Sequence, residues 1–166
     1  MVTANPGRGA EIADLAKSVG LVRTTAPHLL CFAGKMHHAG ARERLDSKVA
    51  GGLIDAGAQG VLVPLPGTVP GIDEATARAM VTASHDAGAL AVGTIGTSQE
   101  GADTATIQSL ALAAKRIGVD AHHIGDAGYT AVAVPENIYA YSIALRGRRH
   151  TWNRMARGAR ASWGGS

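Results

Sequence analysis

Two adjacent histidines and a nearby aspartate could carry out proton transfer in the stretch GVDAHHIGDAGY, residues 118–129. His122 and His123 are neighbours in a short segment that predicts a strand, so their side chains should point to opposite faces of a sheet. Asp126 follows in a glycine-bearing loop, where its carboxylate could orient the inward histidine or accept its proton. The sequence does not identify the inward histidine, and a hydrogen-bonded structural histidine at the rim is the alternative.

A lysine directly after a glycine ends another apolar segment, in AGKMHHAG at residues 33–40. A desolvated lysine at such a position can form a Schiff base, hold a phosphate or neutralise an enolate. The alternative for Lys35 is a solvated loop lysine in an ion pair. His37 and His38 follow as a second adjacent pair, of which His37 is the candidate catalytic residue.

Two glycine-rich loops could cradle a phosphate through backbone N–H groups and a helix N-terminus. They are GTIGTSQEG at residues 93–101 and GDAGYTAVAVPENI at residues 125–138, and each follows a predicted strand. The candidate phosphate-binding residues are Gly96, Thr97, Ser98, Gly125 and Gly128. The alternative is that these glycines only permit tight turns.

The elements that would position these residues repeat a pattern of helix, glycine and strand. Three junctions, DAGAQGVLVPLPG, DAGALAVGTIGT and RIGVDAHHIGDAG, end a helix at Gly57, Gly88 or Gly118 and continue into a short apolar strand. Glycine just past a helix end adopts the left-handed conformation that satisfies the last carbonyls. A weaker copy, KSVGLV at residues 17–22, predicts a helix end near Gly20, before the strand of HLLCFAG.

Two segments between these junctions predict helices. The first, DEATARAMVTASHDAG, carries acidic residues in its first turn, and one of its faces has Ala75, Ala79 and Ala83. The second, DTATIQSLALAAKRIG, has Asp103 or Thr104 as its N-cap. Its apolar face has Ile107, Leu110 and Ala114.

The alternation of strand and helix predicts an α/β fold, a parallel sheet with right-handed crossovers. The strands LLCFA, GVLV and LAVGTI are near-continuous apolar runs, as expected where both faces of a sheet are covered. Pro64 and Pro66 cannot donate to the ladder, so the middle strand should end near Val63. A small open doubly wound sheet and part of a (βα) barrel both fit, and either places the site at the carboxyl ends of the strands.

Composition limits the class of protein. The chain has 166 residues, enough for one compact domain, and 46% of them are hydrophobic. No apolar run long enough for a membrane span and no signal peptide is evident, and the single Cys31 favours a reducing, cytoplasmic setting. Residues 146–166 hold six arginines and no acid, so the remainder has ten basic against thirteen acidic residues. A general polyanion-binding surface is therefore not predicted.

The basic C-terminal segment, residues 146–166, predicts a helix that docks on a single domain spanning residues 1–166. Trp152, Met155 and Ala159 recur at helical spacing and would form its apolar face. The alternative is an arginine-rich contact with nucleic acid, but the segment has no RNA-binding signature. We favour the docked helix, so nucleic acid is not an expected partner.

Several motifs, in order, resemble an uncharacterised bacterial TIM-barrel family, a domain of unknown function. They are NPGRG, AGKMHHAG, LPGTVPG, GTIGTSQEGAD, HHIGDAGY, PENI and SIALRGRRHTWNRMA. Members of that family are sometimes labelled phosphoenolpyruvate phosphonomutase-like or haloacid dehalogenase-like hydrolase. The resemblance implies the C-terminal half of a barrel: strands ending near Ala33, Val63, Ile95 and Ile124 would be the fifth to eighth, and residues 2–5 the tip of the fourth.

The resemblance implies an enzyme acting on a small phosphorylated or carboxylated metabolite, with lyase, mutase or isomerase chemistry. The hydrolase label is less well supported, because no Asp-x-Asp nucleophile motif is present. The cysteine loop expected for a phosphonomutase-type lyase is also not visible. The superfamily analogy favours Mg²⁺ as cofactor, with Glu100 and Asp126 as weak candidate ligands.

The rival hypothesis is a non-catalytic half-barrel, either a truncated product or an assembly module. Half of a barrel exposes two sheet edges and an unclosed apolar interior, which are liabilities unless a partner covers them. We therefore expect a homo-oligomer, or pairing with the missing N-terminal half. A symmetric dimer would restore closure of the barrel.

Overall fold

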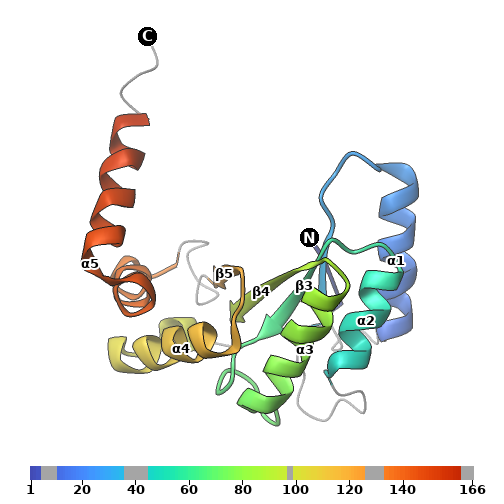
Figure 1. The fold of residues 1–166 in the computed structure, drawn as a ribbon, viewed down its shortest axis with the longest axis horizontal. Helices are drawn as coiled ribbons and strands as arrows, with labels where there is room; N and C mark the ends of the chain where they lie inside the picture. The colour runs from blue at the N-terminus through green and yellow to red at the C-terminus, as the bar shows by residue number, and fades with distance from the viewer. Residues whose placement is uncertain (5–10, 36–44, 97–98, 126–132, 162–166) are drawn as a thin grey trace.

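The protein folds into an open sheet whose strands alternate with helices along the chain (Figure 1). The computed structural model describes residues 1–4, 11–35, 45–96, 99–125 and 133–161. The elements are β1 (Val2–Ala4), α1 (Ile12–Thr25), β2 (Phe32–Lys35), α2 (Ser47–Asp55), β3 (Gly60–Pro64), α3 (Glu74–Asp86), β4 (Leu90–Ile95), the 3-10 helix η2 (Gln99–Gly101), α4 (Thr104–Ile117), β5 (Ala121–Ile124) and α5 (Pro135–Ala161).

The five strands lie side by side in chain order, β1-β2-β3-β4-β5, and every neighbouring pair is parallel. A parallel sheet whose strand order follows the chain winds in one direction, as in a (βα) barrel. A doubly wound sheet would instead reverse its order at a switch point. Of the two predicted architectures, the protein therefore has the barrel type.

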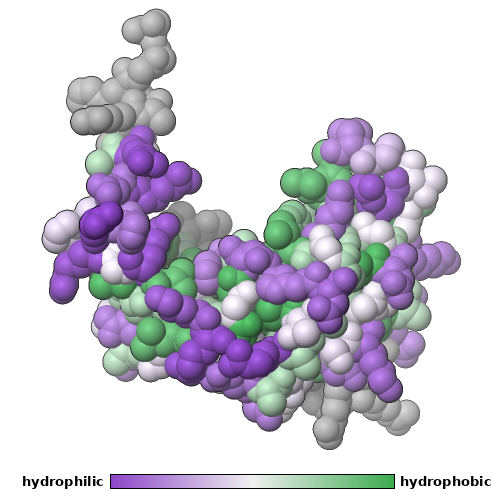
Figure 2. Space-filling view, viewed as in Figure 1, coloured by the Kyte–Doolittle hydropathy of each residue, from purple (hydrophilic) through white to green (hydrophobic). Residues whose placement is uncertain are grey.

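The two faces of the sheet differ in burial. Along β4, Ala91 and Ile95 are buried on one face, whereas Leu90 on the other face is 47% exposed. The face that carries Leu90, Val92 and Thr94 is called the interior face below. The prediction that both faces are covered is wrong for the described residues, because the helices pack on one face and no facing strands cover the other. Figure 2 shows the molecule hollowed between α5 and α1.

Glycines allow neighbouring strands to approach closely on the interior face. A Cβ added at Gly34 would overlap the Cβ of Leu62 on β3 and lie 2.9 Å from its Cγ. A Cβ at Gly60 would overlap the ring of Phe32 on β2. Side chains converge on the concave side of a curved sheet, so large residues there alternate with residues that have no side chain. The two glycines are therefore consistent with barrel curvature.

The glycines at the helix–strand junctions have the predicted conformation. Gly57, Gly88 and Gly118 have φ values of 108°, 70° and 85°, in the left-handed region. The predicted helix end near Gly20 is wrong, because α1 continues to Thr25. The helix ends just before Pro27, which disfavours helical backbone in the residue that precedes it.

The predicted apolar face of the helix of residues 104–117 is confirmed, and that of the preceding helix is wrong. On α4, the buried residues include Ile107, Leu110 and Ala114, and Asp103 is the N-cap, accepting a hydrogen bond from the Thr106 N–H. On α3, Ala75 and Ala79 are exposed. The buried face of α3 instead consists of Ala77, Met80, Val81 and Ser84. This face carries the larger apolar side chains, which gain more from burial than alanine does.

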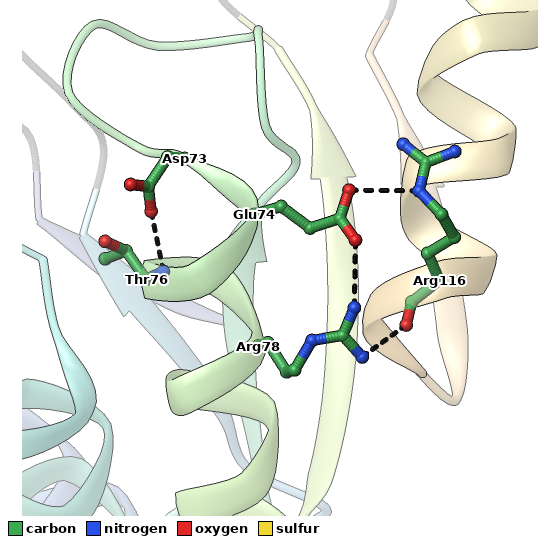
Figure 3. Close-up of polar contacts among 5 residues, drawn as sticks. All are labelled: Asp73, Glu74, Thr76, Arg78 and Arg116. Atoms are coloured by element: carbon green, nitrogen blue, oxygen red, sulfur yellow. Dashed lines mark hydrogen bonds and ion pairs between the residues drawn. The ribbon is translucent and has the colours of Figure 1, made fainter.

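Exposed polar contacts tie α3 to α4 on the outer surface (Figure 3). The Glu74 carboxylate accepts from Arg78 Nη2 at 2.9 Å and from Arg116 Nε at 3.0 Å, and Arg78 Nη1 donates to the Arg116 carbonyl at 2.6 Å. The hydrogen bond from Arg116 lowers the pKa of Glu74. Asp73 caps α3 by accepting from the Thr76 N–H at 2.7 Å. Such exposed pairs add little net stability.

The long helix α5 changes direction at Gly147, which has φ 77° and ψ 165°. Beyond this kink, Thr151 is buried against Ser142, whereas Trp152 and Met155 are 53% and 58% exposed. The predicted division into a body and a docked segment of residues 146–166 stays a prediction. In the described part of the chain, no helix is long and apolar enough to cross a membrane.

We expect Gly34→Ala to lower the free energy of unfolding by about 1–3 kcal/mol, because its new Cβ would overlap the Cβ of Leu62, which cannot move without the backbone. Urea denaturation of the full chain measures the change. Gly52→Ala is the matched control, because nothing lies within 4 Å of a Cβ at that position in α2. There we expect a gain of about 0.5–1 kcal/mol from helix propensity. Equal stability of Gly34→Ala and the wild type would contradict the close approach of β2 and β3.

Candidate functional site

A cavity of about 190 Å³ lies at the carboxyl ends of the strands. Each of the five strands contributes at least one residue to its wall. Its lining consists of Met1, Thr3, Gly34, Lys35, Leu62, Pro64, Thr68, Val69, Thr94, Ile95, Gly96 and His123. Three residues predicted from widely separated stretches, Lys35, Gly96 and His123, are therefore brought together in one place. We call this space the strand-end cavity.

The alternation of side chains along β5 separates the two adjacent histidines. His123 pairs in register with Thr94 of β4, shares the interior face with it, and lines the strand-end cavity. His122 lies on the opposite face, under α5, and its Nδ1 is 2.7 Å from the hydroxyl oxygen of Tyr141. The two rings also meet edge to face, with centroids 5.4 Å apart. The inward histidine is therefore His123, and His122 has a packing role.

Burial shifts both partners of the contact under α5 towards their neutral forms. Desolvation, followed by the positive charge of Arg146, lowers the pKa of His122. Desolvation raises the pKa of Tyr141, so its hydroxyl keeps its proton. A neutral phenol can then donate its hydrogen bond to Nδ1 of a neutral imidazole.

Lys35 is the last residue of β2 and is only 7% exposed. Strict alternation places it with Ala33 on the helix-covered face, but it lines the strand-end cavity because it stands at the end of the strand. Burying an ammonium group is costly unless charge or hydrogen bonding compensates it. Lys35 is therefore not the solvated lysine of the alternative, and its place in the cavity wall lets it contact a ligand there.

A buried carboxylate lies beside the end of β5. Glu100, in η2, is 6% exposed, and its Oε2 has no hydrogen-bond partner among the described residues. A Cβ added at Gly125 would lie 3.0 Å from its Oε1, so the carboxylate packs closely against the backbone at this glycine. The buried Asn137 of α5 holds the turn in place by donating to the backbone carbonyls of Glu100 and Ala102, both at 2.8 Å.

The described residues alone do not form a metal site. No group of three or more histidine, cysteine, aspartate or glutamate side chains lies together among them. Glu100 offers one unpartnered oxygen, whereas Asp126 and His37 lie outside the described residues. Mg²⁺ therefore stays a prediction.

The predicted phosphate cradle is described only in part. Thr97, Ser98 and Gly128 lie outside the described residues. Gly96 lines the strand-end cavity, but the Gly125 N–H already donates to the Ile95 carbonyl at 3.0 Å. The Gly125 amide is therefore used by the sheet, and an anion in the cradle would need other donors.

Sequence reasoning missed three threonines of the strand-end cavity, Thr3, Thr68 and Thr94. The Thr68 hydroxyl donates to the Leu65 carbonyl at 2.7 Å, which fixes the loop after β3. The signal for Thr94 was present, since it is two residues from Val92 in LAVGTI and must share its face. Sequence reasoning also missed the Asn137 clamp, whose contacts span more than thirty residues of chain.

Comparisons with known proteins identify the family of this chain and a solved structure with a similar fold. Residues 1–161 match the model of a domain of unknown function, DUF7916, so the chain belongs to that family. No curated protein matches the sequence. The structure is similar to a deoxyribose phosphate aldolase from Aeropyrum pernix, described as having a unique tetrameric structure. The TM-score is 0.55, with 16% identity over 87% of this chain and 70% of the aldolase chain.

At 16% identity the aldolase match shows the fold alone. That fold is a TIM barrel, and the present sheet is open, so the predicted half-barrel of parallel (βα) repeats is confirmed. The predicted membership of an uncharacterised family with a barrel-like fold is confirmed as well.

We expect the free energy of unfolding to fall as the pH drops below about 6.5, partly because of His122. Its pKa in the folded chain lies below the ordinary value of 6.5, so the unfolded chain takes up this proton more readily. The stabilisation that His122 contributes is complete above its ordinary pKa of 6.5, and it is lost as the pH falls towards the lower pKa of His122 in the folded chain. Urea denaturation between about pH 5 and 8 measures it.

The variant His122→Phe should flatten part of this pH dependence, because phenylalanine keeps an aromatic ring against Tyr141 but cannot take up a proton. Tyr141→Phe is the control. It removes the hydrogen bond but keeps the burial that is the main cause of the shift, so the pH dependence should persist. Identical pH profiles for His122→Phe and the wild type would show that His122 does not couple protonation to folding.

Proposed function

We propose that this member of the DUF7916 family is a TIM-barrel enzyme, or the C-terminal part of one, with lyase or isomerase chemistry on a small phosphorylated or carboxylated metabolite. The observation that carries the proposal is the meeting of a buried lysine, Lys35, and an inward histidine, His123, in one cavity at the strand ends. In barrel enzymes, catalytic groups come from the ends of several different strands. The fold shared with an aldolase supports this class by analogy only.

The two residues suit the removal of a proton from carbon next to a carbonyl group. His123 would accept the proton, and the electron pair of the broken C–H bond would move onto the carbonyl oxygen as an enolate. The Lys35 ammonium would stabilise that developing negative charge. For an α-hydroxy carbonyl compound, isomerase chemistry follows when the hydroxyl proton moves to the enolate oxygen and the carbon proton returns to the former carbonyl carbon. In the lyase direction His123 would instead take the proton of a β-hydroxyl group, the Cα–Cβ bond would break to leave a carbonyl at Cβ, and its electron pair would form the enolate that Lys35 stabilises.

The anionic group of the substrate would be held near Gly96 and the loops that follow β4 and β5. This region corresponds to the place where barrels often bind phosphate. The phosphonomutase-like label is compatible with proton and anion chemistry of this kind, and the hydrolase label has less support. Mg²⁺ is kept as a prediction, and no step above depends on it.

Exchange of carbon-bound hydrogen with deuterium oxide tests the chemistry without knowledge of the full reaction. A panel of small carbonyl compounds carrying a phosphate or carboxylate is incubated with the full chain, and mass spectrometry detects deuterium next to the carbonyl. We expect exchange with at least one compound. His123→Gln should slow it by about 10²–10⁴-fold, because it removes the proton acceptor. Lys35→Met should slow it too, because it removes the charge that stabilises the enolate.

The neighbouring His122→Phe is the matched control. It removes an imidazole one residue away but on the other face of β5, so exchange should continue near the wild-type rate. Circular dichroism of each variant separates loss of chemistry from loss of fold. No exchange with any compound, or unchanged exchange in Lys35→Met, would contradict the proposal.

A second candidate function is an assembly module, favoured by the uncovered interior face. Leu90 on this face is 47% exposed, and Val92 is only half-buried. The free edges of β1 and β5 also present unpaired backbone groups. We propose that a second copy of the chain, or an N-terminal half-barrel, covers these surfaces.

Light scattering of the purified chain tests this assembly. We expect a particle larger than the 16.9 kDa monomer, because an exposed apolar interior favours association. Leu90→Asp should convert it to monomer, since a buried carboxylate at the interface is costly. Leu112→Asp is the control, because Leu112 is 45% exposed on α4, away from the interior face. A well-folded wild-type monomer would exclude self-assembly.

A further inference from the structure

A second cavity, of about 550 Å³, lies between β5 and α5. It differs from the strand-end cavity in that His122 and residues of α5 line it, and the two cavities share His123. Its lining consists of Ala121, His122, His123, Ile124, Ile138, Tyr141, Ser142, Leu145, Arg146 and Arg154. We call this space the helix-side cavity. None of the functions above uses it.

Among the described residues that line the helix-side cavity, the formally charged side chains are both arginines. Arg146 and Arg154 line it, and none of its lining residues is an aspartate or glutamate. Among the described residues, the ion pairs found join other side chains and leave these two arginines without a carboxylate. The positive charge of Arg146 also lowers the pKa of His122 across the cavity.

Arg146 is held in place by buried hydroxyl groups. Its Nε donates to Ser142 Oγ at 2.9 Å, and Ser142 Oγ is 2.9 Å from Thr151 Oγ1. Ser142 and Thr151 are 9% and 3% exposed. Because Nε donates to Ser142, the two terminal nitrogens of the planar guanidinium can face a ligand. These two nitrogens form the fork that binds phosphate or carboxylate oxygens.

The kink at Gly147 brings Arg154 to the same cavity. Along a straight helix, residues 146 and 154 would be about 12 Å apart in height. The backbone of Gly147, with φ 77° and ψ 165°, adopts a conformation open almost only to glycine. The helix therefore changes direction, Thr151 lies against Ser142, and arginines from both sides of the kink line one space.

We propose that the helix-side cavity binds a small organic anion, a phosphate ester whose oxygens bond to Arg146 and Arg154. The apolar part of the ligand would pack on Ile138, Tyr141 and Leu145. Phosphate is favoured over carboxylate because three terminal oxygens can engage two arginines at once. This inference does not depend on the chemistry proposed for the strand-end cavity.

The site also has a direct structural link to the strand-end cavity. His122 lines the helix-side cavity, and the adjacent His123 lines both cavities. A ligand beside His122 would therefore contact the strand that carries the proposed proton acceptor. An anion there would also offset the effect of Arg146 and raise the pKa of His122.

Isothermal titration calorimetry of the full chain with phenyl phosphate and inorganic phosphate at physiological salt tests the site. We expect phenyl phosphate to bind more tightly, because its ring buries apolar surface that inorganic phosphate leaves exposed. Arg154→Gln should weaken binding by about tenfold or more, as expected for a lost charged hydrogen bond. In parallel, NMR titration of the His122 ring should show its pKa rising when phenyl phosphate is present.

Arg148→Gln is the matched control. It removes the same charge from the same helix, but Arg148 is exposed and does not line the cavity. The affinity of the Arg148→Gln variant for phenyl phosphate should stay close to that of the wild type. Equal losses in Arg148→Gln and Arg154→Gln would show general attraction to a basic surface and overturn the site. Absence of binding, or binding with no change in the His122 pKa, would also overturn it.

Discussion

The alternation of side chains along five parallel strands is the constraint on which the candidate sites depend. Each residue on a strand must face either the helices or the barrel interior, so neighbours in sequence are separated in space. On β5, this rule sends His122 to Tyr141 and His123 to the strand-end cavity. The same rule puts Thr94 beside His123 through the register of β4 and β5. Backbone geometry alone therefore places His123 in the wall of the strand-end cavity and its neighbour His122 against Tyr141.

The alternation of side chains also explains why many residues of the strands are glycine or alanine. Where strands curve towards a common axis, side chains on the concave face compete for space, and Gly34 and Gly60 relieve that competition beside Leu62 and Phe32. On the outer face, alanines such as Ala33 and Ala91 are fully buried under helices that pack close to the sheet. Small residues allow close approach on both faces, but only the outer face is sealed in the described chain.

Local signals predicted the framework well, because each has a cause within a few residues. Left-handed glycines end helices, Asp103 caps α4, and Pro64 stops a strand, all through contacts with near neighbours. Signals that depend on distant residues failed. The buried face of α3 is set by what lies beneath it, and the Asn137 clamp joins α5 to a turn more than thirty residues earlier. The spacing of apolar residues along the sequence carries no information about either of these long-range contacts.

The position of β5 between the two cavities has a mechanical consequence. Within the described sheet it is an edge strand, with β4 as its hydrogen-bonded neighbour. Its helix-side face is held by His122 against Tyr141, while its end is confined by the Glu100 carboxylate against Gly125. An edge strand is held by fewer backbone hydrogen bonds than a central strand, and the ligand proposed for the helix-side cavity would lie directly against it. The two adjacent histidines therefore connect the arginine-lined helix-side cavity to the end of the barrel where chemistry is proposed.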